Sequence, residues 1–122
     1  MFTRDYIMRQ IHQLVHVLSI VLLKRNSDKP EEVRHVLDTA LNEQFGHSLP
    51  DFLSMDKESL LSTCSSGDHF YEGLAVALAD LLKEEGSPDG GRRAFWLYQA
   101  VIATGGTVPL HIHEWATSFP SE

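Results

Sequence analysis

The strongest pattern of apolar residues in the sequence lies close to its N-terminus. Apolar residues recur there at spacings of four and three, which keeps them on one side of an α-helix. They are Ile7, Ile11, Leu14, Leu18 and Val21, and a second row of Met8, Val15 and Leu22 widens the same face. Because so little of this segment is polar, we expect its helix either to lie centrally in the domain or to pair with a second copy of itself.

Within this helix, the apolar run Leu14–Leu23 has one feature of a secretory signal peptide, since two arginines precede it. However, His16 and Ser19 interrupt the run, and Lys24 and Arg25 follow it where the small residues of a cleavage site would stand. A run of about ten residues is also too short to cross a bilayer. We therefore expect a core helix and no membrane partner.

A second helix follows a break near residue 27. Pro30 is tolerated in a first turn, where its missing N–H is not needed, and Ser27 or Asp28 can cap the helix. The apolar face that follows consists of Val33, Val36, Leu37, Ala40, Leu41 and Phe45. Gly46 is a typical C-terminal stop, so the pattern predicts that this helix ends beside it.

The rest of the sequence predicts further helices separated by turn-forming residues. A short helix follows Ser54, a longer one extends from a cap at Asp68 to Gly86, and another covers residues 92–103 after a loop at 87–91. Residues 109–119 favour a sixth, short helix. No segment sustains an apolar and polar alternation, so a sheet has little support. We predict an all-α fold of five or six helices in antiparallel pairs.

Composition and charge narrow the class of protein. With 122 residues, of which 43% are hydrophobic and 22% charged, residues 1–122 are expected to form a single helical domain. Ten basic residues against seventeen acidic ones give a net charge of −7, which repels nucleic acid and anionic membranes. Cys64 is the one cysteine, which excludes an intramolecular disulfide and suits the reducing cytoplasm.

Two of the expected helices share a spacing of small and large residues. Residues 33–40 read Val-x-x-x-Leu-x-x-Ala, and residues 94–101 read Ala-x-x-x-Tyr-x-x-Val. This spacing resembles the second helix of a tetratricopeptide repeat, and Leu78-Ala79-x-x-Leu82 is similar to the first helix of that repeat. The two units stand farther apart than the ~34 residues of tandem repeats. The resemblance therefore implies tetratricopeptide-like helical hairpins that bind a protein partner, and not a repeat array.

The opening segment, Arg4–Ile11, resembles the start of an uncharacterised family of small bacterial helical proteins. That resemblance implies a bacterial protein with a helical fold. It carries no activity that could be transferred to this chain, so it bears on the fold and not on the function.

Two pairs of histidines could bind a metal ion. His12 and His16 are four residues apart on the first helix, which suits two ligands of one zinc or nickel ion, but no Glu or Cys completes a known motif. His111 and His113 follow Gly105 as in the metal-binding motif of cupins, yet the glutamate and the second motif of that family are missing. Side chains two apart on a helix also diverge. We therefore predict ordinary surface or packing histidines and no cofactor.

Three other features could carry chemistry. The segment Gly90–Arg93 could hold an anion at the start of a helix, but it lacks a nucleotide-binding motif and a solvated turn explains it. Cys64 has His69 nearby in the sequence but no candidate oxyanion hole, so we expect an inert thiol. The aromatic residues Phe70, Tyr71, Phe95, Trp96 and Tyr98 stand at helical spacing and fit a core. Because no catalytic set results, we predict that the chain is not an enzyme.

These observations favour a non-catalytic protein-interaction or scaffold domain. The apolar face of the first helix is wider than one neighbouring helix would cover, and large obligate interfaces resemble a core cut in half. We therefore expect a homodimer that forms through this helix, with Ile7, Ile11, Leu14 and Leu18 at the interface. The alternative is a small-ligand or metal-binding module that uses the histidine pairs.

Overall fold

The computed structural model describes residues 4–26, 29–106, 108, 112, 114 and 115. It is 79% helical, with six helices and one small antiparallel sheet among these residues, which confirms the predicted all-α class. The elements are α1 (Arg4–Asn26), α2 (Pro30–Phe45), α3 (Leu49–Ser54), α4 (Lys57–Ser62), β1 (Ser65–Ser66), β2 (His69–Phe70), α5 (Glu72–Glu85) and α6 (Pro88–Ala103).

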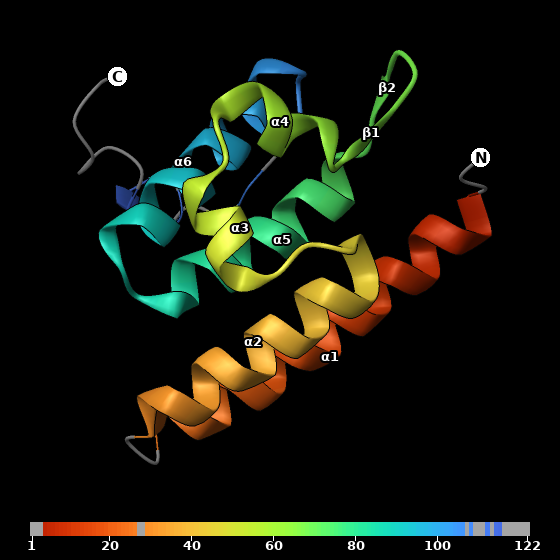
Figure 1. Cartoon of the computed structure of the whole chain (residues 1–122). Coiled ribbons are helices and arrows are strands. Elements are labelled where there is room, and N and C mark those ends of the chain that lie inside the picture. The colour runs from red at the N-terminus through yellow and green to blue at the C-terminus, as the bar shows by residue number, and fades with distance from the viewer. Residues whose placement is uncertain (1–3, 27–28, 107, 109–111, 113, 116–122) are drawn as a thin grey trace.

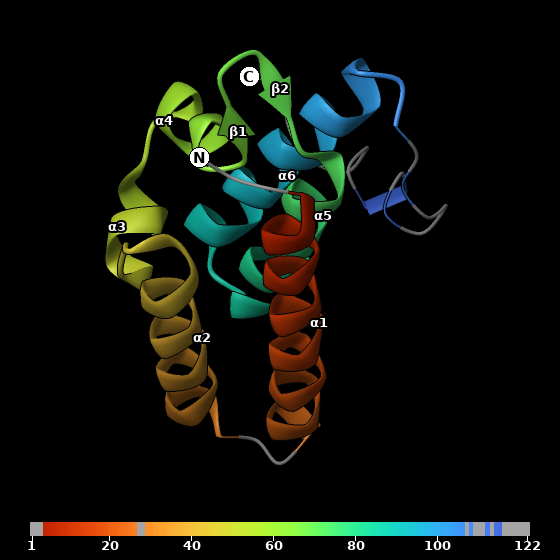
Figure 2. The same ribbon diagram turned by 90° about the vertical axis from the view of Figure 1, so that its right-hand side faces the viewer.

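The helices are arranged around two antiparallel pairs. Helices α1 and α2 form one pair, α5 and α6 form the other, and α1 packs along α5 (Figure 1). Helices α1 and α5 run in the same direction, since Ile11 approaches Gly73 at one end and Leu22 shares a groove with Lys83 toward the other. The view in Figure 2 shows α1 beside α2, with α5 and α6 behind them. Whether these pairs belong with tetratricopeptide hairpins stays a prediction.

The ends of α2 agree with the sequence pattern. Pro30 occupies the first turn, and Gly46 adopts a left-handed conformation, with φ of 75°, that ends the helix. The amide N–H of Gly46 donates to the carbonyl oxygen of Asn42 at 3.0 Å. The N-cap position differs from the prediction: it is taken by Lys29, whose side chain makes no capping hydrogen bond. The two residues predicted as caps, Ser27 and Asp28, lie outside the described part of the chain.

The connection between α5 and α6 differs from the predicted loop at 87–91. Gly86 has a φ of 92°, the hydroxyl of Ser87 accepts a hydrogen bond from the N–H of Gly90, and α6 already begins at Pro88. A Cβ atom at Gly90 would lie 2.6 Å from Oε1 of Glu85 and 2.7 Å from the carbonyl oxygen of Leu82. Gly90 therefore serves the close approach of two helices and not the flexibility of a loop.

A small β-hairpin replaces the predicted cap at Asp68. Strands β1 and β2 pair antiparallel, with Ser65 opposite Phe70 and Ser66 opposite His69. Gly67, with φ of 60°, permits the tight turn between them. Helix α5 consequently starts at Glu72, later than its apolar pattern suggests.

Helices α3 and α4 are short and capped by side chains at their N-termini. Ser48 accepts a hydrogen bond from the N–H of Asp51, and Asp56 accepts one from the N–H of Ser59. Both helices pack against α6 (Figure 1). They occupy the chain between the two helix pairs, which explains why the related spacings in α2 and α6 are so far apart in the sequence.

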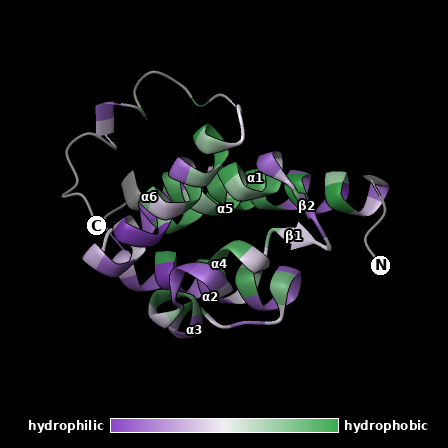
Figure 3. Cartoon of the chain, turned by 90° about the horizontal axis from the view of Figure 1, so that it is seen from above, coloured by the Kyte–Doolittle hydropathy of each residue, from purple (hydrophilic) through white to green (hydrophobic). Residues whose placement is uncertain are grey.

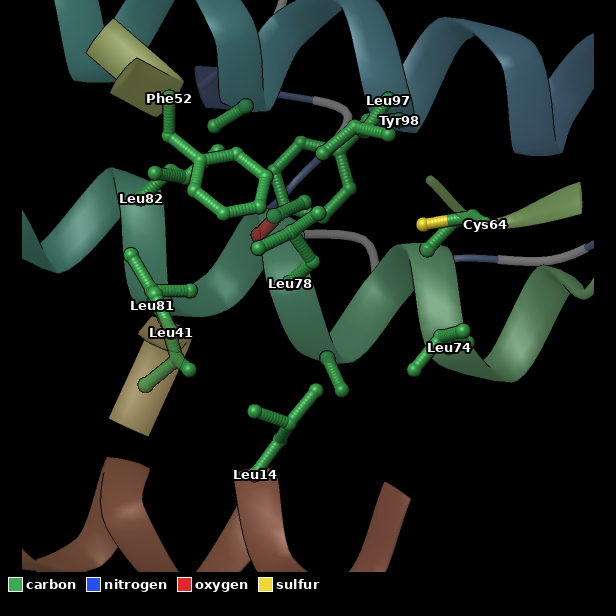
Figure 4. Packing of buried hydrophobic residues seen from close by; sticks show 14 of the residues in the cluster. Leu14, Leu41, Phe52, Cys64, Leu74, Leu78, Leu81, Leu82, Leu97 and Tyr98 are labelled. Atoms are coloured by element: carbon green, nitrogen blue, oxygen red, sulfur yellow. The ribbon is translucent and has the colours of Figure 1, made fainter. Parts of the chain in front are cut away.

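One cluster of buried side chains draws on all six helices. Figure 4 shows Phe52 of α3, Leu78 of α5 and Tyr98 of α6 converging in it, with Leu14 of α1 below them. The hydroxyl of the buried Tyr98 donates to the carboxylate of Asp80. Burial, followed by this hydrogen bond, raises the pKa of the Tyr98 phenol above its usual range. The aromatic ring thus belongs to the core, as predicted for the aromatic residues.

The predicted sixth helix at residues 109–119 lies mostly outside the described residues. Among those that are described, Val108 and Ile112 are buried, and Trp115 packs edge-on against Tyr98 with ring centroids 5.7 Å apart. The chain beyond α6 therefore contributes to the same core.

Helix α1 is the one described helix that could cross a membrane by length and composition, over Asp5–Lys24. This apolar segment is longer than the run Leu14–Leu23 considered from the sequence. The core helix of a soluble protein and an N-terminal signal sequence meet the same criterion. Helix α1 packs against both α2 and α5, and 22% of this segment is buried.

Candidate interaction surface

Helix α1 carries two rows of apolar side chains with opposite environments. Ile7, Leu14 and Val21 face inward and are 4%, 0% and 0% exposed. Met8, Val15 and Leu22 are 45%, 53% and 44% exposed. In Figure 3, α1 and α5 carry much of the hydrophobic colour, whereas α2 and α3 show more polar residues. Among the described residues, the second row is therefore the part of this apolar face that stays exposed.

The exposed row has the spacing of a coiled-coil seam. Met8, Val15 and Leu22 are seven residues apart, and half-buried Ile11 and Leu18 stand three residues after the first two. Apolar residues at alternating spacings of three and four correspond to the a and d positions of a heptad. This row, Met8–Ile11–Val15–Leu18–Leu22, is called the seam below.

A groove between the seam and α5 lies at each end of the row. Near the start of α5 its volume is about 550 Å³, and its walls include Met8, Ile11, Phe70 and Tyr71. Gly73 lies in the same wall, where an added Cβ would come 3.1 Å from Cδ1 of Ile11. Toward the end of α5 a second depression of about 230 Å³ is lined by Leu18, Leu22, Val76, Asp80, Lys83, Glu84 and Ile112. Apolar side chains therefore extend from the seam into a shallow channel beside it.

The two sides of the seam differ in charge. On the α5 side, Glu72, Asp80 and Glu84 line the grooves, together with Lys83 and His69. Glu72 accepts a hydrogen bond from the hydroxyl of Thr104, and Nζ of Lys83 lies 3.6 Å from Oε2 of Glu84. The opposite side of α1 exposes Asp5, Arg9, His12 and His16. One side is therefore net negative, and the other combines one arginine, one aspartate and two histidines.

The four residues predicted at the interface fall into two groups. Ile7 and Leu14 are buried beneath α1 in the chain's own core, so they cannot contact a partner in this fold. Ile11 and Leu18 are half-buried and belong to the seam. The sequence pattern missed the exposed residues, since it placed Met8, Val15 and Leu22 only at the margin of the face. Their seven-residue spacing is the signal that could have identified them.

The histidine pairs do not gather into a metal site within the described residues. His12 and His16 are both exposed on α1, and no group of three or more His, Cys, Asp or Glu side chains that could hold an ion occurs in the described part of the chain. His111 and His113 lie outside it. The prediction that these are ordinary histidines stays a prediction.

The segment Gly90–Arg93 is not the solvated turn that the sequence favoured. Both glycines are buried in the first turn of α6. The carboxylate of Glu85 lies at this helix N-terminus, where it accepts hydrogen bonds from the N–H and hydroxyl of Ser87. Nε of Arg34 stands 3.7 Å from the other oxygen of Glu85. The chain's own carboxylate thus occupies the place that an external anion would take.

Cys64 is fully buried between α4 and β1. Desolvation raises the pKa of its thiol to about 12, against the smaller opposing effect of a contact with the hydroxyl of Thr63. A thiol that stays protonated and covered is a poor nucleophile. This environment agrees with the expected inert cysteine.

The aromatic residues divide between core and surface. Tyr98 is fully buried, whereas Trp96 is half-buried and packs beneath the guanidinium of Arg93, 5.1 Å from its ring centroid. Phe70 and Tyr71 line the larger groove beside α1. They are therefore the aromatic residues that lie in the groove beside the seam.

Comparisons with known proteins add no relationship. No protein family, no curated protein and no solved structure matches this chain. The surface of α1 and its surroundings are therefore the features of this chain that bear on function.

Proposed function

We propose that this chain is a non-catalytic protein-interaction module that self-associates through the seam on α1. The observation that carries the proposal is the exposure of Met8, Val15 and Leu22 at heptad spacing beside an apolar groove. Contiguous apolar surface of this kind on a soluble protein marks an interaction site. A second helix with the same spacing would pack its side chains between those of the seam.

Charge supports a protein partner over other macromolecules. The whole chain has a net charge of −7, which opposes the approach of nucleic acid and anionic lipid. A second copy of α1 brings both the apolar row and Arg9 to a groove that Glu72, Asp80 and Glu84 border. The same surface therefore contains complementary elements, as an interface between identical copies requires.

The test compares two substitutions of exposed residues on α1. Val15→Glu places a charge at the centre of the seam, whereas Gln13→Glu places the same charge on an exposed residue on the opposite side of the helix. We expect sedimentation velocity to show a dimer for the wild-type chain and for Gln13→Glu, and a monomer for Val15→Glu. Circular dichroism of the three proteins should agree, because neither side chain belongs to the core.

A monomeric wild-type chain at tens of micromolar would contradict the proposal. Dissociation by both substitutions would also contradict the assignment to the seam, because it would show that the charge acts wherever it is placed on α1.

A further inference from the structure

We infer that the two copies pair with their α1 helices parallel and in register, related by a two-fold axis along the seam. This inference rests on the proposed self-association and adds the orientation of the partner. It follows from the unequal charges on the two sides of the seam. Each step below uses the positions of residues around α1.

The contacts of α1 show which neighbour each side of this helix faces, in order around its circumference. The amide nitrogen of Gln10 donates to the carbonyl oxygen of Gln44, which marks the side facing α2. Ile7 and Leu14 face the core, and Ile11 approaches α5 at Gly73. Beyond the exposed Val15, the next positions at 100° per residue belong to Ser19 and His12, and Asp5, Leu23, His16 and Arg9 follow. The seam thus separates an α5 side from a histidine side.

The two possible pairings bring different sides together. In a parallel pair of helices, the side next to position d of one helix faces the side next to position a of its partner. The α5 side of each copy would then face the histidine side of the other. In an antiparallel pair, like sides meet, so the two α5 sides would face each other.

Charge complementarity selects between these arrangements. Antiparallel pairing would place Glu72, Asp80 and Glu84 of both copies on the same side of the interface, with one lysine and His69 from each copy beside them. Parallel pairing places these carboxylates opposite Arg9, His12 and His16, with Asp5 as the one acidic residue on that side. Since charges beside a seam set helix orientation, the parallel arrangement is favoured.

The register of the two helices follows from how far along α1 each acidic residue of the α5 side lies. Glu72 borders the groove at the level of Met8 and Ile11, where Arg9 and His12 of the second copy would stand. Asp80 borders it at the level of Leu18, near His16 of the second copy. The centre of the seam also has a β-branched residue at position a, Val15, and a leucine at position d, Leu18, which parallel two-stranded pairs favour.

Cysteine cross-linking tests the orientation directly. Met8 and Leu22 are both exposed, and fourteen residues of helix separate them by roughly 21 Å. A disulfide requires Cα atoms within about 7 Å. Under mild oxidation, we expect Met8→Cys alone and Leu22→Cys alone each to form a covalent dimer. The wild-type chain is the control, because its Cys64 is buried and should form no cross-link.

The outcomes separate this inference from the proposed function. A wild-type chain that sediments as a monomer under reducing conditions contradicts self-association itself. A dimeric wild-type chain that cross-links only when Met8→Cys and Leu22→Cys are mixed shows antiparallel pairing and overturns the inference alone. A dimer in which neither variant cross-links, alone or mixed, shows that the partner lies elsewhere and overturns it as well.

A charge reversal supplies an independent measurement. Arg9→Glu changes an exposed side chain without touching the seam. In the parallel arrangement the new carboxylate faces the acidic α5 side of the partner, so the dissociation constant should rise roughly threefold to tenfold. An unchanged or tighter dimer would contradict the parallel arrangement, because only antiparallel pairing keeps position 9 away from the partner's α5.

Discussion

Helices α5 and α1 are both rich in apolar residues, yet only α5 is covered by neighbouring helices on most of its sides. In α5, Ala75, Ala77 and Ala79 are buried beside larger residues, and neighbouring helices cover most of its circumference. In α1 the apolar residues are large throughout, and α2 and α5 cover only part of it. The difference shows that small residues let other helices pack closely against several sides of an apolar helix. Without them, one row of α1 stays exposed.

The largest expected effect comes from truncating a residue in each helix. Leu78 in α5 is fully buried, so Leu78→Ala should lower the free energy of unfolding by about 3 kcal/mol. Val15 in α1 is exposed, so Val15→Ala should change it by less than about 0.5 kcal/mol. Urea denaturation at low protein concentration, where association does not contribute, measures both. Equal losses of unfolding free energy in the two variants would contradict the difference in burial between α5 and the exposed row of α1.

A smaller effect tests the close approach of α5 and α6. Replacing glycine by alanine within a helix usually stabilises it, but a Cβ at Gly90 would meet the carbonyl oxygen of Leu82 at 2.7 Å. We therefore expect Gly90→Ala to destabilise the protein by about 2 kcal/mol. Gly46→Ala is the control: a Cβ there meets nothing within 4 Å, and the positive φ alone should cost about 1 kcal/mol. A stabilised Gly90→Ala protein would show that the two helices are not packed closely at their turn.

A third effect depends on pH and tests whether the core beside α5 excludes water. The thiol of Cys64 has its pKa raised to about 12 from an ordinary value of 9.0. In the unfolded chain it therefore ionises first, which favours unfolding as the pH rises from about 9 to about 12. The free energy of unfolding should fall by up to about 1.4 kcal/mol per pH unit from this group.

The Cys64→Ala protein isolates this contribution. Its free energy of unfolding should fall less steeply over the same pH range, while the effect of other groups, including Tyr98, remains in both proteins. Parallel pH profiles for the two proteins would mean that the thiol is hydrated in the folded state.

Much of the helical fold could be predicted because its signals are local. Gly46 and Gly86 end their helices through left-handed conformations that other residues rarely adopt, and Pro30 stands in a first turn. The start of α6 carries a similar local signal, since Ser87 caps it and Pro88 stands in its first turn, but the two glycines that follow are typical of a loop. The approach of Glu85 and Leu82 explains why residue 90 is a glycine.

The exposed apolar row of the candidate interaction surface could be predicted only in part, for a related reason. The helix on which it lies is evident from apolar spacing, but α1 contains two apolar rows, and both satisfy a helical period. Which row faces inward depends on where α5 packs, and this contact joins residues far apart in the sequence, such as Ile11 and Gly73. Ile7 and Leu14 were therefore assigned to an interface that Met8 and Val15 are better placed to form.

The measurement that tests the central claim most directly is the molecular mass of the wild-type chain in solution. Sedimentation equilibrium over a range of micromolar concentrations should give twice the 13.7 kDa of one chain and fall toward that value on dilution. The Val15→Glu protein should give the mass of one chain throughout. A wild-type mass of one chain at every concentration, or a dimer that Val15→Glu leaves intact, would contradict the claim that the seam on α1 joins two copies.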